Sequence, residues 1–209
     1  MVKIKIGELK RQALMLIFPE LELQLDEENE KSLCDLLNNL RCDPSIKSYL
    51  DSMTPAINRA LGKIEGCGAT KTKSVEISED SLEYQNGGYR LNLESLDNAL
   101  YVKEIYKNGK SISFDTLERD AILINEKGNL KVYYKPRLAR ISNKTDESQE
   151  LNLPRDVAEI IPYYIKSELV YEDDKESSKD SLNEFNSRLL SLADKWEYGQ
   201  IKSVYKLGL

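Results

Sequence analysis

Histidine is absent from the sequence, and this removes both the commonest general base and the commonest transition-metal ligand of proteins. Catalytic triads, histidine-based zinc sites and histidine-dependent acyl transfer are therefore excluded. The three cysteines, Cys34, Cys42 and Cys67, have neither CxxC spacing nor the pattern of a disulfide framework, so we expect them to be reduced. The sequence predicts no catalytic residue, no cofactor and no metal site.

Long apolar runs are missing as well. No stretch approaches the roughly 18 apolar residues of a membrane span, and the start, MVKIKIGELK, lacks the apolar core of a signal peptide. We therefore expect a protein that is made in the cytoplasm and does not enter a membrane. With a net charge of −6, the chain lacks the excess of basic residues that is typical of a nucleic-acid binder. The one dense basic stretch, residues 135–144 with Arg137 and Arg140, is either a solvated loop or a contact for phosphate or an acidic partner.

Glycine-rich phosphate cradles are also missing, since neither GxxxxGK[ST] nor GxGxxG occurs. Acidic side chains are the remaining source of catalytic chemistry. Glu172, Asp173 and Asp174 are the candidates for a Mg²⁺-dependent carboxylate hydrolase. Lysines interleave with the surrounding acids, and no glycine stands at an EF-hand turn position. The pattern favours a solvated connection between two helices, with acids in the first turn of the second.

Helical periodicity dominates the first third of the chain. The spacing predicts a helix over residues 7–18, a second helix capped by Asp26 and a third that begins at Asp43-Pro44. Thr54-Pro55 repeats the cap-and-proline signal inside the third pattern. This predicts either two abutting helices or one kinked helix that ends near residue 65.

The apolar period changes from 3.6 to 2 near residue 72. We predict three hairpins, over residues 81–93 with a turn at Asn86-Gly87, over 99–114 with a turn at Asn108-Gly109, and over 121–135 with a turn through Gly128. Three such hairpins predict an antiparallel sheet or a small sandwich. Tyr133 alternates away from the face of Leu130, Val132 and Tyr134, so one of the two neighbouring tyrosine rings should lie outside the core.

The helical period returns after a polar linker. A wide stripe from Val157 to Leu169 includes Tyr164 but leaves Tyr163 outside it, and a narrower 3-4 repeat runs from Leu182 to Trp196. We therefore predict an α+β fold in which N- and C-terminal helices form one bundle with a central antiparallel β insertion. The expected boundaries are residues 1–70 for the first helices, 71–142 for the insertion, 143–198 for the closing helical pair and 199–209 for an extended C-terminal arm.

Tyrosine is abundant, with 12 residues against 3 phenylalanines and 1 tryptophan. Such a bias suits subunit interfaces, where a ring is buried while its hydroxyl stays wet, although strand propensity explains it equally well. The arm could add a strand to a neighbour or fray in solution. The candidate interaction residues are Tyr133, Arg137, Arg140, Tyr163, Ile201, Val204, Tyr205 and Leu207.

Three stretches together resemble the head-to-tail connector (adaptor or head-completion) proteins of tailed bacteriophages. Residues 53–65, MTPAINRALGKIE, are similar to an early helix of that family. Residues 103–141 are similar to its hairpin region, which ends in Tyr-Lys-Pro. Residues 151–192 are similar to its closing helical pair, in which a proline-marked helix leads through Glu-Asp-Asp to a helix with Asn-Glu-Phe.

The resemblance implies a non-enzymatic structural protein of the virion neck. It implies a homo-oligomeric ring, with a dodecamer as the expected size, which lies beneath the portal protein and docks the tail or a tail adaptor. Genome DNA would pass through the channel without sequence-specific binding, and an acidic chain would let it slide. The alternatives are a binding module from the tail or baseplate, with hairpins that contact a partner or carbohydrate, and the Mg²⁺-dependent hydrolase.

Overall fold

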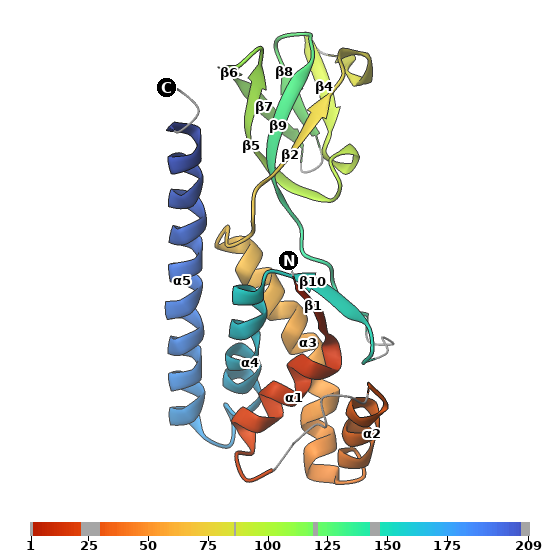
Figure 1. The fold of residues 1–209 in the computed structure, drawn as a ribbon, viewed down its shortest axis with the longest axis vertical. Helices are drawn as coiled ribbons and strands as arrows, with labels where there is room; N and C mark the ends of the chain where they lie inside the picture. The colour runs from red at the N-terminus through yellow and green to blue at the C-terminus, as the bar shows by residue number, and fades with distance from the viewer. Residues whose placement is uncertain (1, 22–29, 86, 119–120, 143–146, 206–209) are drawn as a thin grey trace. The chain divides into compact units, whose positions relative to one another are not determined.

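The computed structural model describes residues 2–21, 30–85, 87–118, 121–142 and 147–205. Within them the chain is a mixed α+β protein with antiparallel strands (Figure 1). It divides into two compact units, one built from residues 1–69 and 138–209 and the other from residues 70–137. We call the first the helical unit and the second the β unit.

The helical unit contains all α-helices of the described residues, and the third of them begins at a predicted side-chain cap. In chain order the described helices are α1 (Ile6–Ile17), α2 (Glu30–Leu40), α3 (Pro44–Gly66), α4 (Arg155–Leu169) and α5 (Lys175–Tyr205). At the start of α3, the Asp43 carboxylate accepts a hydrogen bond from the Ser45 N–H at 2.9 Å, and Pro44 occupies the first helical position. The predicted cap is therefore confirmed. Asp26 lies outside the described residues.

Two prolines lie inside helices without ending them. Pro55 is inside α3, which runs as one helix where the sequence left one kinked or two abutting helices open. Pro162 is inside α4. A proline removes one backbone hydrogen bond of the helix, and this loss must be offset by tertiary packing. Ile57, which follows Pro55 in α3, and Ile161, which directly precedes Pro162 in α4, are completely buried. Core contacts therefore stabilise both helices next to their prolines.

The C-terminal helix is longer than the sequence predicted. Asp174 caps it by accepting hydrogen bonds from the N–H groups of Glu176 and Ser177 at 3.1 and 3.0 Å. The helix then continues to Tyr205, so the prediction of an extended arm from residue 199 is wrong as far as residue 205. Gly199 lies inside this helix, and a glycine in the interior costs a helix only about 1 kcal/mol, which a helix of 31 residues tolerates.

The core of the helical unit joins segments from both ends of the sequence. α4 packs against α1, α3 and α5, and β1 (Val2–Lys5) pairs antiparallel with β10 (Glu150–Leu153) (Figure 1). Leu61 of α3, Ile161 of α4 and Phe185 of α5 are completely buried members of this core. Because its two halves are separated by the whole β unit in sequence, neither half holds a complete core by itself.

The β unit contains two four-stranded antiparallel sheets, with strand orders β2-β9-β5-β6 and β3-β4-β8-β7. The strands are β2 (Lys73–Ile77), β3 (Glu83–Gln85), β4 (Gly88–Asn92), β5 (Ala99–Lys107), β6 (Lys110–Ile112), β7 (Phe114–Glu118), β8 (Ala121–Ile124) and β9 (Leu130–Pro136).

The first two predicted hairpins are confirmed and the third is wrong. β3 pairs with β4, and β5 pairs with β6 through a turn in which Asn108 and Gly109 both have positive φ. β8 and β9, however, belong to different sheets: β8 pairs with β4 and β7, whereas β9 pairs with β2 and β5. Alternation shows which face of a strand is apolar, but it does not show which neighbour the strand pairs with.

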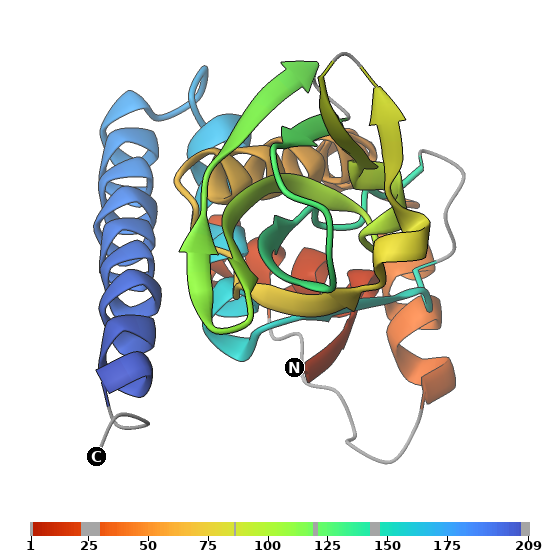
Figure 2. The same ribbon diagram turned by 90° about the horizontal axis from the view of Figure 1, so that it is seen from above.

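The two sheets are joined at both edges by short connections. β6 and β7 are separated only by Ser113, and β2 reaches β3 through a short 3₁₀ helix, Glu79–Ser81. The chain therefore links each edge of one sheet to an edge of the other, and the strands curl around a common centre (Figure 2). Ile105 and Val132 from one sheet and Ile122 and Ile124 from the other fill this centre. The sequence left an antiparallel sheet or a small sandwich open, and the structure has two antiparallel sheets that curl around one core as a nearly closed barrel.

Candidate interaction surfaces

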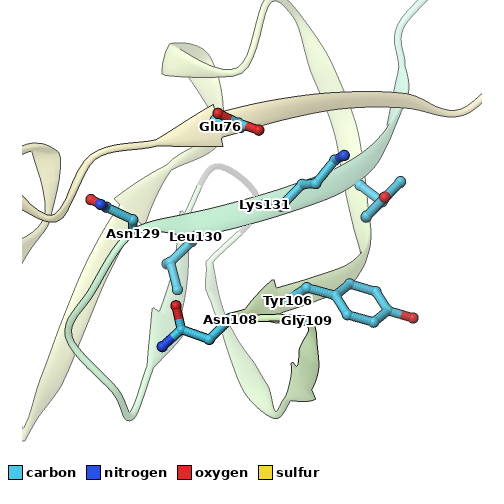
Figure 3. A pocket seen from close by; sticks show the side chains of 8 residues that line it. Glu76, Tyr106, Asn108, Gly109, Asn129, Leu130 and Lys131 are labelled. Carbon is cyan, nitrogen blue, oxygen red and sulfur yellow. The ribbon is translucent and has the colours of Figure 1, made fainter.

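A cavity of about 360 Å³ lies on the β2-β9-β5-β6 sheet (Figure 3). It is bordered by polar and aromatic side chains and by the turn between β5 and β6. The lining residues are Glu76, Tyr106, Asn108, Gly109, Asn129, Leu130, Lys131 and Tyr133. We call this cavity the tyrosine pocket.

The strand register explains why these side chains meet. Lys131 of β9 is the cross-strand partner of Glu76 on β2 and of Tyr106 on β5, so the three side chains lie side by side across the sheet. Tyr133 lies two residues farther along β9 on the same face. Its ring meets the Tyr106 ring edge to face at a centroid distance of 5.6 Å, and the Lys131 ammonium lies 5.7 Å from the Tyr133 ring centroid.

The two neighbouring tyrosines of β9 divide as the alternation predicted. The Tyr134 side chain is 3% exposed and belongs to the barrel core, whereas Tyr133 is partly exposed on the other face. Burial raises the pKa of the Tyr134 hydroxyl. The Tyr106 hydroxyl donates a hydrogen bond to the Glu104 carboxylate at 3.1 Å, and this contact raises the pKa of Tyr106. The Tyr106 phenol of the pocket is therefore neutral at physiological pH.

A second cleft, of about 330 Å³, lies in the helical unit among α3, α4 and α5. Arg59 pairs with one oxygen of Glu168, while the other oxygen, Oε2, is buried and has no hydrogen-bond partner among the described residues. Tyr164 lies in the same cleft, beneath the Lys63 ammonium, which is 5.7 Å from its ring centroid. Burial is the main cause that raises the pKa of Tyr164, and the nearby Glu168 charge adds to it.

Two of the three acidic residues at positions 172–174, which follow α4, have structural roles. Asp174 caps α5, and the Asp173 carboxylate accepts a hydrogen bond from the Tyr49 hydroxyl at 2.5 Å. Glu172 is exposed. Across the described residues, no group of three or more cysteines and carboxylates is placed to hold a metal ion. The hydrolase candidates Glu172, Asp173 and Asp174 thus do not converge on one site.

The basic stretch is largely engaged within the chain. Lys135 is buried and donates a hydrogen bond to the Thr70 carbonyl at 2.6 Å, and the Arg137 guanidinium donates to the Ala99 carbonyl at 3.3 Å. Arg140 forms an ion pair with Glu65 at 2.5 Å, and Glu65 also accepts a hydrogen bond from the Leu138 N–H. Each of these contacts lies within one of the two units, and the two predicted interaction arginines are not simply solvated.

Tyr163 lies off the buried stripe of α4, as predicted, but its ring is covered. The Arg188 guanidinium of α5 lies 4.6 Å from the Tyr163 ring centroid, and Tyr163 packs against the core of the helical unit. The more exposed aromatic side chain of this region is Tyr171, with 58% of its surface accessible. The sequence did not single it out, because it follows the helical stripe directly.

The C-terminal candidates are described only in part. Ile201, Val204 and Tyr205 lie on helix α5, while the positions of their side chains are outside the description. Leu207 lies outside the described residues. Within the described residues the cysteines form no disulfide; Cys34 is half-buried, and Cys42 and Cys67 are exposed.

Sequence reasoning missed Glu76, Tyr106 and Asn129 as members of one pocket, and it missed the exposure of Tyr84. Tyr84, on β3, is 70% exposed although it belongs to an apolar alternation. Only the pairing of β2 with β9 brings Glu76 to the pocket, and these strands are more than fifty residues apart in sequence. The one signal in the sequence for this pocket is that polar and aromatic residues gather at the ends of the strands that line it.

The chain matches no protein-family model, and it matches no curated protein. Within the described residues, no helix is both long enough and apolar enough to cross a membrane.

Proposed function

We propose that this protein is a head-to-tail connector of a tailed bacteriophage, a non-enzymatic virion protein. In this proposal it forms a homo-oligomeric ring beneath the portal, docks the tail or a tail adaptor, and lets genome DNA pass without binding a specific sequence. The helices of both ends form a bundle that carries the β unit as an insertion. The starting point is the ordered resemblance of three separate stretches to that family.

One observation carries the proposal: two of the resembling stretches hold each other through motif residues. The Asn58 side chain, in the first stretch, donates to the Ile141 carbonyl at 2.7 Å and accepts from the Ile141 N–H at 2.8 Å. Glu65, at the end of the same stretch, binds the Leu138 N–H and the Arg140 side chain. The family-like motifs at 53–65 and 138–141 thus act as one structural element.

The third stretch joins the same core. Tyr164 and Phe185 lie in it, with a ring-centroid distance of 5.0 Å, and both belong to the core that contains Ile57 and Leu61 of the first stretch. Motif residues that pack together are expected to be retained together, because each depends on the others for burial. This is a physical reason for three loose motifs to occur in a fixed order.

The test is binding to the portal protein encoded in the same genome. Purified chain is mixed with portal rings, and the mixture is separated by sedimentation and imaged by electron microscopy. We expect the chain to sediment with the portal and to add a ring of density beneath it. A chain that remains unbound at a large excess over portal, and whose deletion leaves tail joining unaffected, would contradict the proposal. Recovery in isolated tails or baseplates would favour the tail-module alternative.

A further inference from the structure

The tyrosine pocket exposes polar groups that its own surroundings leave open to solvent. Glu76, Asn108 and Lys131 are exposed residues of its lining. Among the described residues, neither the Glu76 carboxylate nor the Asn108 amide forms a hydrogen bond or an ion pair. The Asn129 carbonyl oxygen accepts a hydrogen bond from the Glu79 N–H at 3.2 Å, so its NH₂ group remains a donor. Hydrogen-bonding groups of the pocket are therefore open to a ligand.

These groups combine hydrogen-bond donors with acceptors. The Glu76 carboxylate only accepts, the Lys131 ammonium only donates, and the Asn108 amide does both. The Tyr106 hydroxyl donates to the Glu104 carboxylate at 3.1 Å, so its oxygen keeps lone pairs for an outside donor. A hydroxyl group has one donor and two acceptor sites, and a ligand with several hydroxyl groups therefore needs a mixed lining of this kind.

Two tyrosine rings supply an apolar wall beside the polar groups. The ring planes of Tyr106 and Tyr133 meet at 74°, with a centroid distance of 5.6 Å, and so form a corner. The face of an aromatic ring carries partial negative charge and attracts the polarised C–H groups of a sugar ring. Figure 3 shows the Tyr106 ring at one end of the pocket and the amides of Asn108 and Asn129 at the other. A ligand that has both a C–H face and hydroxyl groups matches this division.

The charges of the pocket disfavour the other classes of ligand. Its lining has one carboxylate, Glu76, and one ammonium, Lys131, and thus no net charge. A polyanion such as nucleic acid would meet Glu76 and the neighbouring Glu104 without an excess of cations. An apolar ligand would cover both charged groups without giving them hydrogen bonds, which costs free energy. A neutral polar ligand avoids both penalties.

We propose that the tyrosine pocket binds a neutral saccharide. One sugar ring lies against Tyr106 and Tyr133, and its hydroxyl groups bind to the exposed polar side chains of the pocket. The cavity of about 360 Å³ lies at the lower end of the usual range for ligand sites, about 300–1,000 Å³, and suits a short saccharide. A free oligosaccharide and an exposed chain of a polysaccharide present the same chemistry. The inference goes beyond the proposed connector function and does not depend on ring assembly.

The experiment titrates the ¹⁵N-labelled full chain with neutral oligosaccharides up to about 10 mM, where weak ligands are detected. The probes are cellotriose, maltotriose, xylotriose, mannotriose and chitotriose. We expect at least one of them to bind saturably and to shift the NMR signals of β2, β5 and β9 around the pocket.

Three variants test whether the pocket residues hold the probe. Tyr133→Ala should weaken its binding at least about tenfold, as for an aromatic anchor of a binding site. Glu76→Gln keeps the size of the side chain and should weaken binding about threefold, because a neutral hydrogen bond replaces a charge-assisted one. The matched control is Tyr84→Ala, which removes a tyrosine that is 70% exposed on the other sheet and should bind as the wild type does. Unfolding temperatures verify that all three variants are folded.

Insoluble polymers separate the two sources of the ligand. Retention of the chain on the polymer of the bound sugar, such as chitin or cellulose, assigns the site to a polysaccharide, whereas binding of the trimer alone assigns it to a free oligosaccharide. The inference is wrong if no neutral probe binds, if dextran sulfate binds more tightly than all of them, or if Tyr133→Ala and Glu76→Gln bind as tightly as the wild type. The connector proposal is judged by portal binding, which uses none of these probes, so either proposal can fail without the other.

Discussion

The helical unit and the β unit reach a closed core by different routes. The β unit is one continuous segment, residues 70–137, whose strands pair both with consecutive and with distant strands of that segment and curl into a barrel. The helical unit closes its core only when α1 and α3 meet α4 and α5, which follow the β unit in sequence. Continuity therefore makes the β unit a candidate for independent folding, while the helical unit depends on contacts between distant segments.

The largest test of this comparison is to separate the units. We expect residues 70–137 alone to fold cooperatively, and we expect residues 1–69 alone to lack a stable fold, because α4 and α5 are missing from their core. Replacement of residues 70–137 by a short Gly/Ser linker should leave the helical unit folded. Circular dichroism and NMR spectra check each piece. An unfolded β unit or a well-folded 1–69 fragment would contradict the comparison.

Single core truncations test whether the units unfold separately. Phe185→Ala should destabilise the helical unit by about 3–5 kcal/mol, because the completely buried ring of Phe185 leaves a cavity. Far-ultraviolet circular dichroism, which reports the helices, follows that transition in urea, because all described α-helices belong to the helical unit.

Ile105→Ala is the matched truncation in the barrel core, where Ile105 is also completely buried. It should destabilise the β unit by about 2–5 kcal/mol and leave the unfolding transition of the helices in place. If both variants shift one common transition by the same amount, the two units fold as a single cooperative body and the comparison fails.

Local patterns predicted the helices and the turns better than they predicted strand partners. The Asp43-Pro44 cap and the Asn108-Gly109 turn were correct, because each depends on backbone geometry within a few residues. The third hairpin was wrong, because β8 and β9 have the alternation of a hairpin but pair in different sheets. The extended arm was wrong as far as Tyr205, because one glycine does not stop a long helix.

The candidate contact residues divide in the same way. The outward position of Tyr133 followed from alternation, whereas its pocket neighbours Glu76 and Tyr106 follow from long-range strand order. Tyr163 was correctly placed off the stripe, yet Arg188 of a different helix covers its ring. A side chain's exposure depends on the elements packed beside it, which periodicity within one helix does not contain.

The helical unit contains a buried ion pair, and its loss should cost more stability than the loss of an exposed pair in the β unit. Glu147, which is 6% exposed, binds Lys10 at 3.1 Å and Arg41 at 2.6 Å, and Lys10 itself is 4% exposed. Glu147→Ala should destabilise the helical unit by about 3 kcal/mol, because it leaves the Lys10 ammonium buried without its carboxylate.

The control for this variant is Asp97→Asn in the β unit, which breaks the exposed pair with Lys73 and keeps a residue type that tolerates the positive φ of position 97. An exposed pair contributes little to stability, so this change should be nearly silent. Urea unfolding of both variants checks the difference. Equal losses for the two would show that burial does not decide the strength of these pairs.

The smallest predicted effect concerns the Tyr49 hydroxyl, whose hydrogen bond joins α3 to the segment that follows α4. Tyr49 of α3 donates to Asp173, 124 residues later, and this hydrogen bond raises the pKa of Tyr49 to about 12. A hydroxyl whose pKa is higher in the folded protein than the usual value of about 10 stabilises the fold below pH 10. That contribution is then lost as the pH rises from about 10 to about 12.

Tyr49→Phe should therefore cost about 1 kcal/mol near pH 8, since the contact is partly exposed, and the difference from wild type should shrink near pH 11. Tyr106→Phe is the matched change in the β unit, where the hydroxyl binds Glu104 only two residues away on the same strand. That local contact closes no loop between distant segments, so its loss should be smaller. Equal effects, or a Tyr49 effect that grows with pH, would show that sequence separation does not govern these contacts.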